Sequence, residues 1–276
     1  MTKVLVTGAT GFVGRQVVRA LDGQGISLIP VVRAGKDGLL SGVGHVDRII
    51  TTPDLFAEDE AWWEAKCQGA DLIIHAAWYT EPGKYLQSAL NMDCLIGSIR
   101  LARGAAKAGV RRFVGIGTCA EYDQSHGVLT LDTALKPSTP YAGAKAALFL
   151  ALSHWLPSQT VSFAWCRLFY LYGEGEDERR LVPYIRRQLV KGEPAELTSG
   201  TQIRDFMDVV DAGAKITEVA LSDRKGPVNI CSGVPVTVRQ LAERVADEYK
   251  RKDLLRFGVR SENPFDPPCV IGAQGT

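Results

Sequence analysis

The sequence predicts an α/β fold: a doubly wound parallel sheet with helices on both faces, followed by a smaller C-terminal lobe. Short β-branched runs alternate with longer helical patterns, and several of these runs are continuously apolar, as in strands buried on both sides. This rhythm changes after about Leu171. With 276 residues, 46% of them hydrophobic and 23% charged, the chain has the size and composition of a large globular domain with an appendage.

Six short runs are the expected strands of the first part: residues 3–7, 27–32, 47–51, 71–75, 112–117 and 161–167. Helical hydrophobic patterns lie between them, at residues 11–22, 57–66, 89–108 and 140–156. Farther on we expect an amphipathic stretch at 182–191, a strand at 227–231, a helix at 237–249 and a loop at 263–268. The first domain is therefore expected at residues 1–171 with about 205–231, and the lobe at 172–204 and 232–276.

Charge and hydropathy exclude several classes of protein. Lys and Arg number 32 against 31 Asp and Glu, a net charge of +1, so no global field recruits nucleic acid or an anionic membrane. The first apolar run is too short for a signal peptide, and residues 146–152 fall far short of the ~20 apolar residues that span a bilayer. Six cysteines without metal-ligand spacing indicate reduced, buried thiols and no metal site. We expect a cytoplasmic protein.

A glycine motif follows the first expected strand and opens the first helix. Gly8, Gly11 and Gly14 stand three apart, with Thr10, Phe12 and Val13 among them. Such glycines permit a tight turn, a close approach of backbone N–H groups to a pyrophosphate, and close packing of the helix on the sheet. The motif predicts a Rossmann-type dinucleotide-binding domain.

The end of the second strand distinguishes between the two nicotinamide cofactors. NAD sites place an Asp or Glu there to bind the ribose 2′-hydroxyl. This chain has no carboxylate at the spot, and Arg33 and Lys36 are suited to a 2′-phosphate. The alternative is that Arg33 is a solvated loop charge. We therefore expect NADP(H) to be favoured, with NAD(H) possible.

A tyrosine and a lysine stand four apart at the start of the helix predicted over 140–156. Thr139 can cap this helix and Pro140 suits its first turn, which places Tyr141 and Lys145 on one face. An adjacent ammonium favours the phenolate form, so it lowers the pKa of a tyrosine from about 10. Upstream, the strand predicted over 112–117 is followed by Thr118, which adds a hydroxyl to this group.

With these residues the sequence resembles the extended short-chain dehydrogenase/reductase family, in its branch of nucleotide-sugar epimerases, dehydratases and 4-ketoreductases. The resemblance covers nearly the whole chain. It rests on Gly8/Gly11/Gly14, Asp54-Leu55, His75-Ala76-Ala77, Asn91, Thr118, Tyr141/Lys145, the run from Arg167 to Gly173, and the run from Arg204 to Asp211. After Val270-Ile271-Gly272 the family normally continues with another loop and helix.

The resemblance implies roles for individual residues. Tyr141 would be the general acid/base, Lys145 would lower its pKa and bind the nicotinamide ribose, and Thr118 would bind the substrate oxygen. The implied cofactor-binding residues are Gly8, Thr10, Gly11, Phe12, Val13, Gly14, Asp54, Leu55, His75, Ala76, Ala77, Tyr141, Lys145 and Phe169. Arg204 would contact the nucleotide diphosphate, unless it forms a structural salt bridge to Asp205 or Asp208. Further sugar-pocket candidates, each balanced against plain packing or surface charge, are Tyr79, Glu121, Tyr172 and Arg180.

Two departures from the family pattern narrow the chemistry. Dehydratases of this branch carry acidic residues directly after the threonine, where this chain has Cys119 and Ala120. Cys119 is either an acid/base for epimerisation next to a carbonyl or a plain buried residue. We expect NADPH-dependent reduction of the 4-keto group of a nucleotide-linked 4-keto-6-deoxy sugar. The alternatives are an NAD-dependent 4-epimerase, a reductase of non-sugar carbonyls and a non-catalytic redox sensor.

The helix predicted over 140–156 is apolar nearly all round. A sheet covers only one stripe of such a helix, so the remainder needs a second surface. The resemblance implies the same, because the family commonly dimerises through this helix and the one expected at 89–108. We therefore expect a homodimer that binds a nucleotide-diphosphate sugar.

Overall fold

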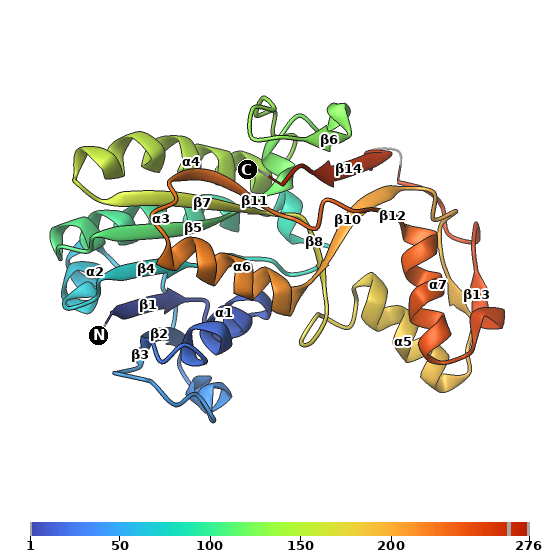
Figure 1. Cartoon of the computed structure of the whole chain (residues 1–276), viewed down its shortest axis with the longest axis horizontal. Coiled ribbons are helices and arrows are strands. Elements are labelled where there is room, and N and C mark those ends of the chain that lie inside the picture. The colour runs from blue at the N-terminus through green and yellow to red at the C-terminus, as the bar shows by residue number, and fades with distance from the viewer. Residues whose placement is uncertain (1, 264–265, 275–276) are drawn as a thin grey trace.

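The computed structural model describes residues 2–263 and 266–274, and a seven-stranded parallel sheet forms its centre (Figure 1). The strand order is β11-β7-β5-β4-β1-β2-β3, which confirms the predicted doubly wound sheet. The strands are β1 (Lys3–Thr7), β2 (Ser27–Arg33), β3 (Ile50–Thr52), β4 (Leu72–His75), β5 (Arg112–Thr118), β7 (Ser162–Leu168) and β11 (Gly226–Ile230). Only β3 is clearly shorter than the run predicted for it.

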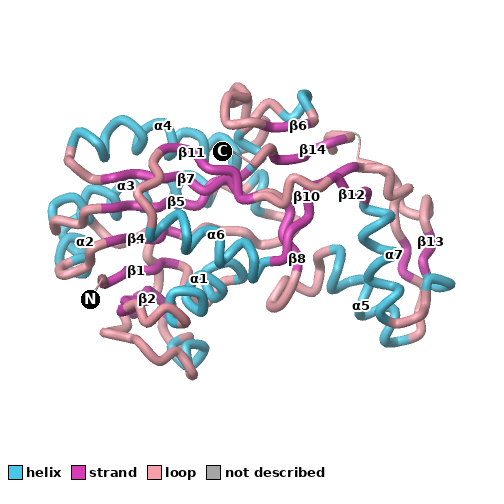
Figure 2. Tube along the Cα trace, viewed as in Figure 1, coloured by secondary structure: helices cyan, strands magenta, loops and turns pink. Residues whose placement is uncertain are grey.

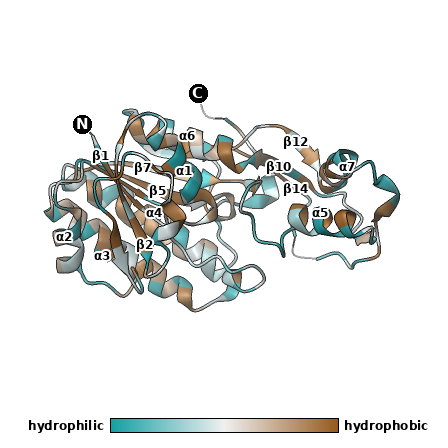
Figure 3. Cartoon of the chain, turned by 90° about the horizontal axis from the view of Figure 1, so that it is seen from below, coloured by the Kyte–Doolittle hydropathy of each residue, from teal (hydrophilic) through white to brown (hydrophobic). Residues whose placement is uncertain are grey.

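Helices cover both faces of this sheet. One layer consists of α1 (Phe12–Asp22) and α6 (Val209–Leu221), and the other of α2 (Glu60–Cys67), α3 (Leu90–Lys107) and α4 (Pro140–Ser158). Alternate residues of β1 serve the two layers: Val4 and Val6 belong to the first core cluster and Leu5 to the second, all three without exposure. Figure 3 shows the apolar residues concentrated in the central strands. Burial on both sides explains why the strands are continuously apolar.

Side-chain caps set where two helices begin. The Asp59 carboxylate accepts a hydrogen bond of 2.7 Å from the Trp62 N–H, so α2 begins at Glu60 rather than at the predicted residue 57. Thr139 accepts from the Ala142 N–H at 3.2 Å, and Pro140 occupies the first turn of α4 as predicted.

The rest of the chain forms a smaller lobe beside the carboxyl ends of the sheet (Figure 2). Its core lies between α5 (Leu181–Lys191) and α7 (Val238–Glu248), which match the predicted amphipathic stretch and helix. A second sheet has the order β12-β10-β14-β6, with β8 paired to β10. Its strands, together with the pair β9 and β13, are β6 (Val128–Leu129), β8 (Tyr170–Tyr172), β9 (Ala195–Glu196), β10 (Ile203–Asp208), β12 (Pro235–Thr237), β13 (Leu255–Arg256) and β14 (Cys269–Gly272).

Sequence reasoning missed the strands of this second sheet. In β10, Arg204 and Asp205 are both buried, so the strand lacks the apolar pattern by which a buried strand is recognised. Residues 264 and 265 of the loop predicted at 263–268 lie outside the described residues. The domain boundary near residue 171 stays a prediction.

All six cysteines are free, and five of them are buried, with Cys269 partly exposed. Among the helices of the described residues, none combines the length and the apolarity that a membrane span requires.

Candidate active site

A cavity of about 1730 Å³ lies at the carboxyl ends of the central strands. It extends from Arg33, the last residue of β2, and nearby Lys36 to Arg180 and Arg204 on the side of the small lobe. Parallel α/β sheets bind ligands in the crevice outside the carboxyl ends of their strands. Most of the residues predicted from the sequence line this cavity, and three of them, His75, Glu121 and Tyr172, do not.

The glycine loop forms one wall of the cavity. Gly8 has a φ of +68°, and a Cβ on Gly14 would lie 2.0 Å from the Gly8 carbonyl oxygen, so neither position accepts a side chain. Gly11 precedes α1 without any side-chain cap. The first N–H groups of α1 are therefore available to an anion at the helix N-terminus. The loop is shaped as a cradle that fits a dinucleotide pyrophosphate.

Cations gather at the far end of this cradle. Arg33 and Lys36 line the cavity together with Asp54 and Leu55, and Arg100 of α3 joins them. Within the described residues, none of these three cations forms a side-chain ion pair or hydrogen bond. Arg100 was missed in the sequence because it lies inside a helix, far from the motif that suggested the other two.

His75 was predicted to bind the cofactor, and the structure corrects this. Its ring is 1% exposed, with Nδ1 2.7 Å from the Thr7 hydroxyl and Nε2 2.7 Å from the Ser98 hydroxyl. Burial lowers the pKa of His75 to about 3, so the ring is neutral. His75 ties β1, β4 and α3 together behind the cavity, whereas the next residues, Ala76 and Ala77, line it.

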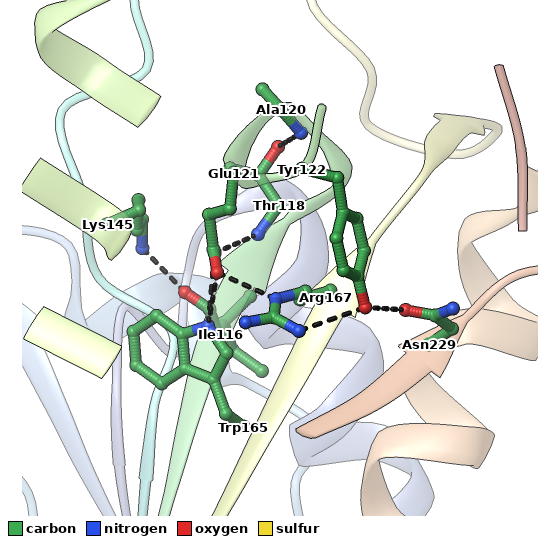
Figure 4. Close-up of polar contacts among 9 residues, drawn as sticks. All are labelled: Ile116, Thr118, Ala120, Glu121, Tyr122, Lys145, Trp165, Arg167 and Asn229. Atoms are coloured by element: carbon green, nitrogen blue, oxygen red, sulfur yellow. Dashed lines mark hydrogen bonds and ion pairs between the residues drawn. The ribbon is translucent and has the colours of Figure 1, made fainter. Parts of the chain in front are cut away.

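Thr118, Tyr141 and Lys145 meet in the middle of the cavity. Burial raises the pKa of Tyr141 well above its usual range, and a hydrogen bond with Thr118 opposes that rise. Lys145 is 3% exposed, and its Nζ donates a hydrogen bond of 2.6 Å to the Ile116 carbonyl oxygen (Figure 4). Burial lowers the pKa of Lys145 to about 7. Both protonation states of this lysine are therefore populated near neutral pH.

Two aromatic side chains that sequence reasoning missed enclose Tyr141. The Tyr85 ring meets the Tyr141 ring edge-on with centroids 4.8 Å apart, and Trp78 does the same at 6.5 Å. Asn91 joins both: its Oδ1 accepts from Trp78 Nε1 at 2.9 Å, and its Nδ2 donates to the Tyr85 carbonyl at 2.6 Å. Trp78 directly follows the Ala76-Ala77 pair, so its place after a cofactor-lining motif was the available signal.

Glu121 was predicted as a sugar-pocket residue, and the structure places it in the protein interior instead (Figure 4). Its carboxylate lies 2.7 Å from Arg167 Nε and accepts hydrogen bonds from Trp165 Nε1 at 3.0 Å and the Thr118 N–H at 2.8 Å. A buried carboxylate needs such partners. Glu121 therefore positions the Thr118 backbone and does not reach the cavity.

Cys119 and Ala120 do line the cavity beside Thr118. Burial raises the pKa of the Cys119 thiol to about 12, so at neutral pH it stays protonated. This favours the interpretation of Cys119 as a buried small residue over that of an acid/base.

The small-lobe side of the cavity is lined by Tyr79, Phe169, Arg180 and Arg204, and also by Glu176, which was not predicted. The prediction of Tyr172 as a sugar-pocket residue was wrong, because its side chain packs against the apolar cluster of α5 and α7. Arg204 is 2% exposed and pairs at 2.7 Å with Asp266, not with either predicted aspartate.

The carboxylates of Asp205 and Asp208 accept hydrogen bonds from backbone N–H groups instead. Asp205 accepts hydrogen bonds from the N–H groups of Ser232, Gly233 and Gly272, and Asp208 caps α6 through the Val210 N–H. Among the described residues there is no cluster of His, Cys, Asp and Glu suited to a metal ion.

Comparison with known proteins agrees with this geometry. Residues 4–231 match the NAD dependent epimerase/dehydratase family. A dTDP-6-deoxy-L-talose 4-dehydrogenase (NAD(+)) of Aggregatibacter actinomycetemcomitans is 25% identical, over 98% of this chain and 99% of the relative. A dTDP-glucose 4,6-dehydratase of Streptomyces griseus is 30% identical, over 87% of this chain and 76% of the relative. The structure of MoeE5 in complex with UDP-glucuronic acid and NAD is 26% identical, with a TM-score of 0.81, and the match covers 99% of this chain and 90% of that one. The resemblance found in the sequence is confirmed: the chain belongs to the NAD dependent epimerase/dehydratase family of extended short-chain dehydrogenases/reductases.

Proposed function

We propose that the protein reduces the 4-keto group of a nucleotide-linked 4-keto-6-deoxy sugar with NADPH. The observation that carries this proposal is the hydrogen-bonded pair of Thr118 and Tyr141 at the centre of a cavity with arginines at both ends. The long cavity has room for a dinucleotide on one side of the pair and a nucleotide sugar on the other.

The residues present fit a nicotinamide dinucleotide. The cradle of Gly8 to Gly14 would hold its pyrophosphate, and Asp54 and Leu55 would flank its adenine. Arg33 and Lys36 would bind a 2′-phosphate, since they stand at the cradle's end without a carboxylate partner. When bound, the cofactor supplies the hydride that a carbonyl reduction requires.

The protein's own residues handle the proton. The Tyr141 hydroxyl would give its proton to the carbonyl oxygen, and the Thr118 hydroxyl would hold that oxygen in place. Loss of this proton would turn Tyr141 into a phenolate. A charged Lys145 would stabilise that phenolate and so lower the barrier to proton transfer. Burial of Tyr141 raises its pKa, so this charge matters to the step.

The substrate side supports a nucleotide sugar and disfavours dehydration. Arg180 and Arg204 line the end of the cavity near the small lobe, where they would bind the diphosphate. Neither Cys119 nor Ala120 offers the carboxyl groups that elimination of water needs. The relative from Aggregatibacter is, by its name, a 4-dehydrogenase of a dTDP-linked 6-deoxy sugar, and reduction of a 4-keto group is the reverse of that reaction. That name also specifies NAD(+), so the preference for NADPH needs its own test.

The experiment follows absorbance at 340 nm after mixing the protein with NADPH or NADH and 4-keto-6-deoxy sugars linked to dTDP, GDP, CDP or UDP. Oxidation of NADPH with one nucleotide would support the proposal and identify the base. Silence across the panel, together with interconversion of a nucleotide hexose by protein-bound NAD, would instead support a 4-epimerase that uses the same Thr118 and Tyr141.

A further inference from the structure

The ammonium of Lys145 lies against the face of an indole ring. Its Nζ is 3.8 Å from the centroid of the Trp78 ring, and a second indole, Trp165, is 5.9 Å away. A cation over the face of a tryptophan is attracted by the ring quadrupole, most strongly where water is excluded. With Lys145 buried, the Trp78 face is one of the few groups that can stabilise its charge.

The Trp78 ring is also fixed in this orientation. Its Nε1 donates to the side chain of Asn91, which is fully buried, and Phe56 meets the indole edge-on at 6.3 Å. Asn91 in turn donates to the carbonyls of Tyr85 and Ser88. The indole therefore does not turn freely, and its face stays toward Lys145.

The other titratable groups around Lys145 are either neutral or already paired with an opposite charge. The Glu121 carboxylate raises the pKa of Lys145, but Arg167 pairs with that carboxylate at 2.7 Å. Burial raises the pKa of the Cys94 thiol to about 11, so it is neutral, and the buried His75 is neutral as well. Tyr141 lies one helical turn away and is protonated. The ammonium is therefore stabilised mainly by two uncharged groups in direct contact with it, the Ile116 carbonyl oxygen and the face of the Trp78 indole.

We propose that Trp78 is a positioning residue of the reaction: its indole face holds the Lys145 ammonium beside Tyr141. This inference rests on the proposed function, because the charge matters only if Tyr141 transfers a proton. Without the indole, the charged lysine would lose a favourable partner, and its proton would leave at lower pH. The fraction of enzyme with a charged Lys145 at neutral pH would then fall.

The test weakens the ring's quadrupole without changing its shape. Tryptophan analogues with one, two or three fluorine atoms are introduced at position 78 alone, which retains the Asn91 hydrogen bond and the packing. Lysine labelled with ¹³C at Cε reports the Lys145 titration in the cofactor-free protein, with the resonance assigned by its loss in Lys145→Arg. We expect the pKa of Lys145 to fall stepwise with fluorine number, by about one unit in all.

A matched control uses the same analogues at position 62. Trp62 lies 5.5 Å from Lys66 on α2, outside the cavity, so fluorination there should leave the Lys145 titration unchanged. A Lys145 titration that is the same in all position-78 variants would overturn the proposal.

The kinetic readout is the pH profile of kcat/KM. Its alkaline limb should move to lower pH together with the Lys145 titration in the position-78 series, whereas a merely structural role of Trp78 would lower the rate at every pH alike. If no nucleotide sugar is turned over by any form of the protein, the proposed function fails, and the titration still decides whether Trp78 stabilises the charge.

Discussion

Nε of Arg167 lies 2.7 Å from the Glu121 carboxylate, and both side chains are buried next to the candidate catalytic Thr118. Tyr122 completes this cluster, since its hydroxyl accepts a hydrogen bond from Arg167 Nη1 at 2.9 Å and donates one to Asn229 at 2.8 Å. The pair thus anchors the end of β5 through the Thr118 N–H (Figure 4), and Thr118 itself lines the cavity.

Removal of one charge of this pair should be costly. In Glu121→Gln the Arg167 guanidinium stays buried without a counterion, which destabilises proteins by about 3–5 kcal/mol. Urea denaturation should show a loss of that order in the free energy of unfolding. The matched control is Glu174→Gln, which breaks the exposed pair with Arg19 and should cost less than about 1 kcal/mol. Equal losses in the two variants would contradict a central role for the buried pair.

Substitution of the proposed acid should separate binding from turnover. In Tyr141→Phe the proton donor is lost while the ring and its edge-on contact with Tyr85 remain. We expect turnover to fall by roughly 10² or more, with cofactor affinity nearly unchanged. Activity is followed at 340 nm, and binding by the fluorescence of NADPH. Tyr249→Phe, in the small lobe, is the control, and a Tyr141→Phe protein with ordinary turnover would refute the role of Tyr141.

Arg33, at the end of β2, and Lys36, just after it, should determine the cofactor preference. In the double variant Arg33→Ala/Lys36→Ala, the partners of a 2′-phosphate are lost, and each charge-assisted hydrogen bond contributes about 1.5–3 kcal/mol. NADPH should therefore bind at least tenfold more weakly, whereas NADH affinity should stay the same. Arg111→Ala removes an exposed arginine at the opposite end of the sheet and serves as control. If the wild-type protein binds NADH as tightly as NADPH, the assignment of Arg33 is wrong.

The neutral state of His75 makes stability depend on pH. Its pKa is about 3 in the folded protein against about 6.5 in an unfolded chain, so below pH 6.5 only the unfolded state takes up the proton. The stabilising contribution is complete above pH 6.5 and is lost as the pH falls toward 3, by about 1.4 kcal/mol for each pH unit. Urea titrations at pH 7 and pH 5 should show this loss, and His75→Gln should reduce the difference. His154→Gln, on the exposed face of α4, should leave it unchanged.

Exposed apolar side chains on α3 and α4 support the expected homodimer, which we propose forms through these helices. Met92, Ile96 and Leu150 are each about half exposed, at 48%, 48% and 50%. A charge at the centre of an apolar interface is not tolerated, so Ile96→Glu should convert the dimer to a monomer in sedimentation velocity. Val190→Glu, at an exposed apolar position of α5, should not change the mass. A wild-type protein that sediments as a monomer at all concentrations would exclude the dimer.

The large sheet and the glycine cradle could be predicted because their signals are local. Alternation of short apolar strands with helices, and three glycines at fixed spacing after a strand, need no knowledge of distant residues. The same holds for Thr139 and Pro140, which place Tyr141 and Lys145 on the first turns of α4. These patterns do not predict the direction in which a side chain at the end of a strand points.

That direction is where sequence reasoning failed. His75 directly precedes residues that line the cavity and Glu121 directly follows others, yet both side chains point into the interior. There Thr7 and Ser98 are the partners of His75, and Arg167 is the partner of Glu121. Tyr172 turns away in the same manner, into the small-lobe core. Buried polar side chains seek whichever partners the packing provides, and those partners come from residues far away in the chain.

By itself, then, the sequence determined the fold class and the cofactor cradle, which follow from residue type and short-range spacing. It also singled out Thr118, Tyr141 and Lys145 as candidate site residues, and all three line the cavity. Only the tertiary structure decided which groups surround that trio. Trp78 and Tyr85 enclose Tyr141, Asn91 joins them, and Glu121 orients Thr118, and none of these contacts could be read from the sequence. The physical reason is that the charge state of a buried lysine or tyrosine depends on neighbours in space, and these are assembled only when the sheet, the helices and the loops between them pack together.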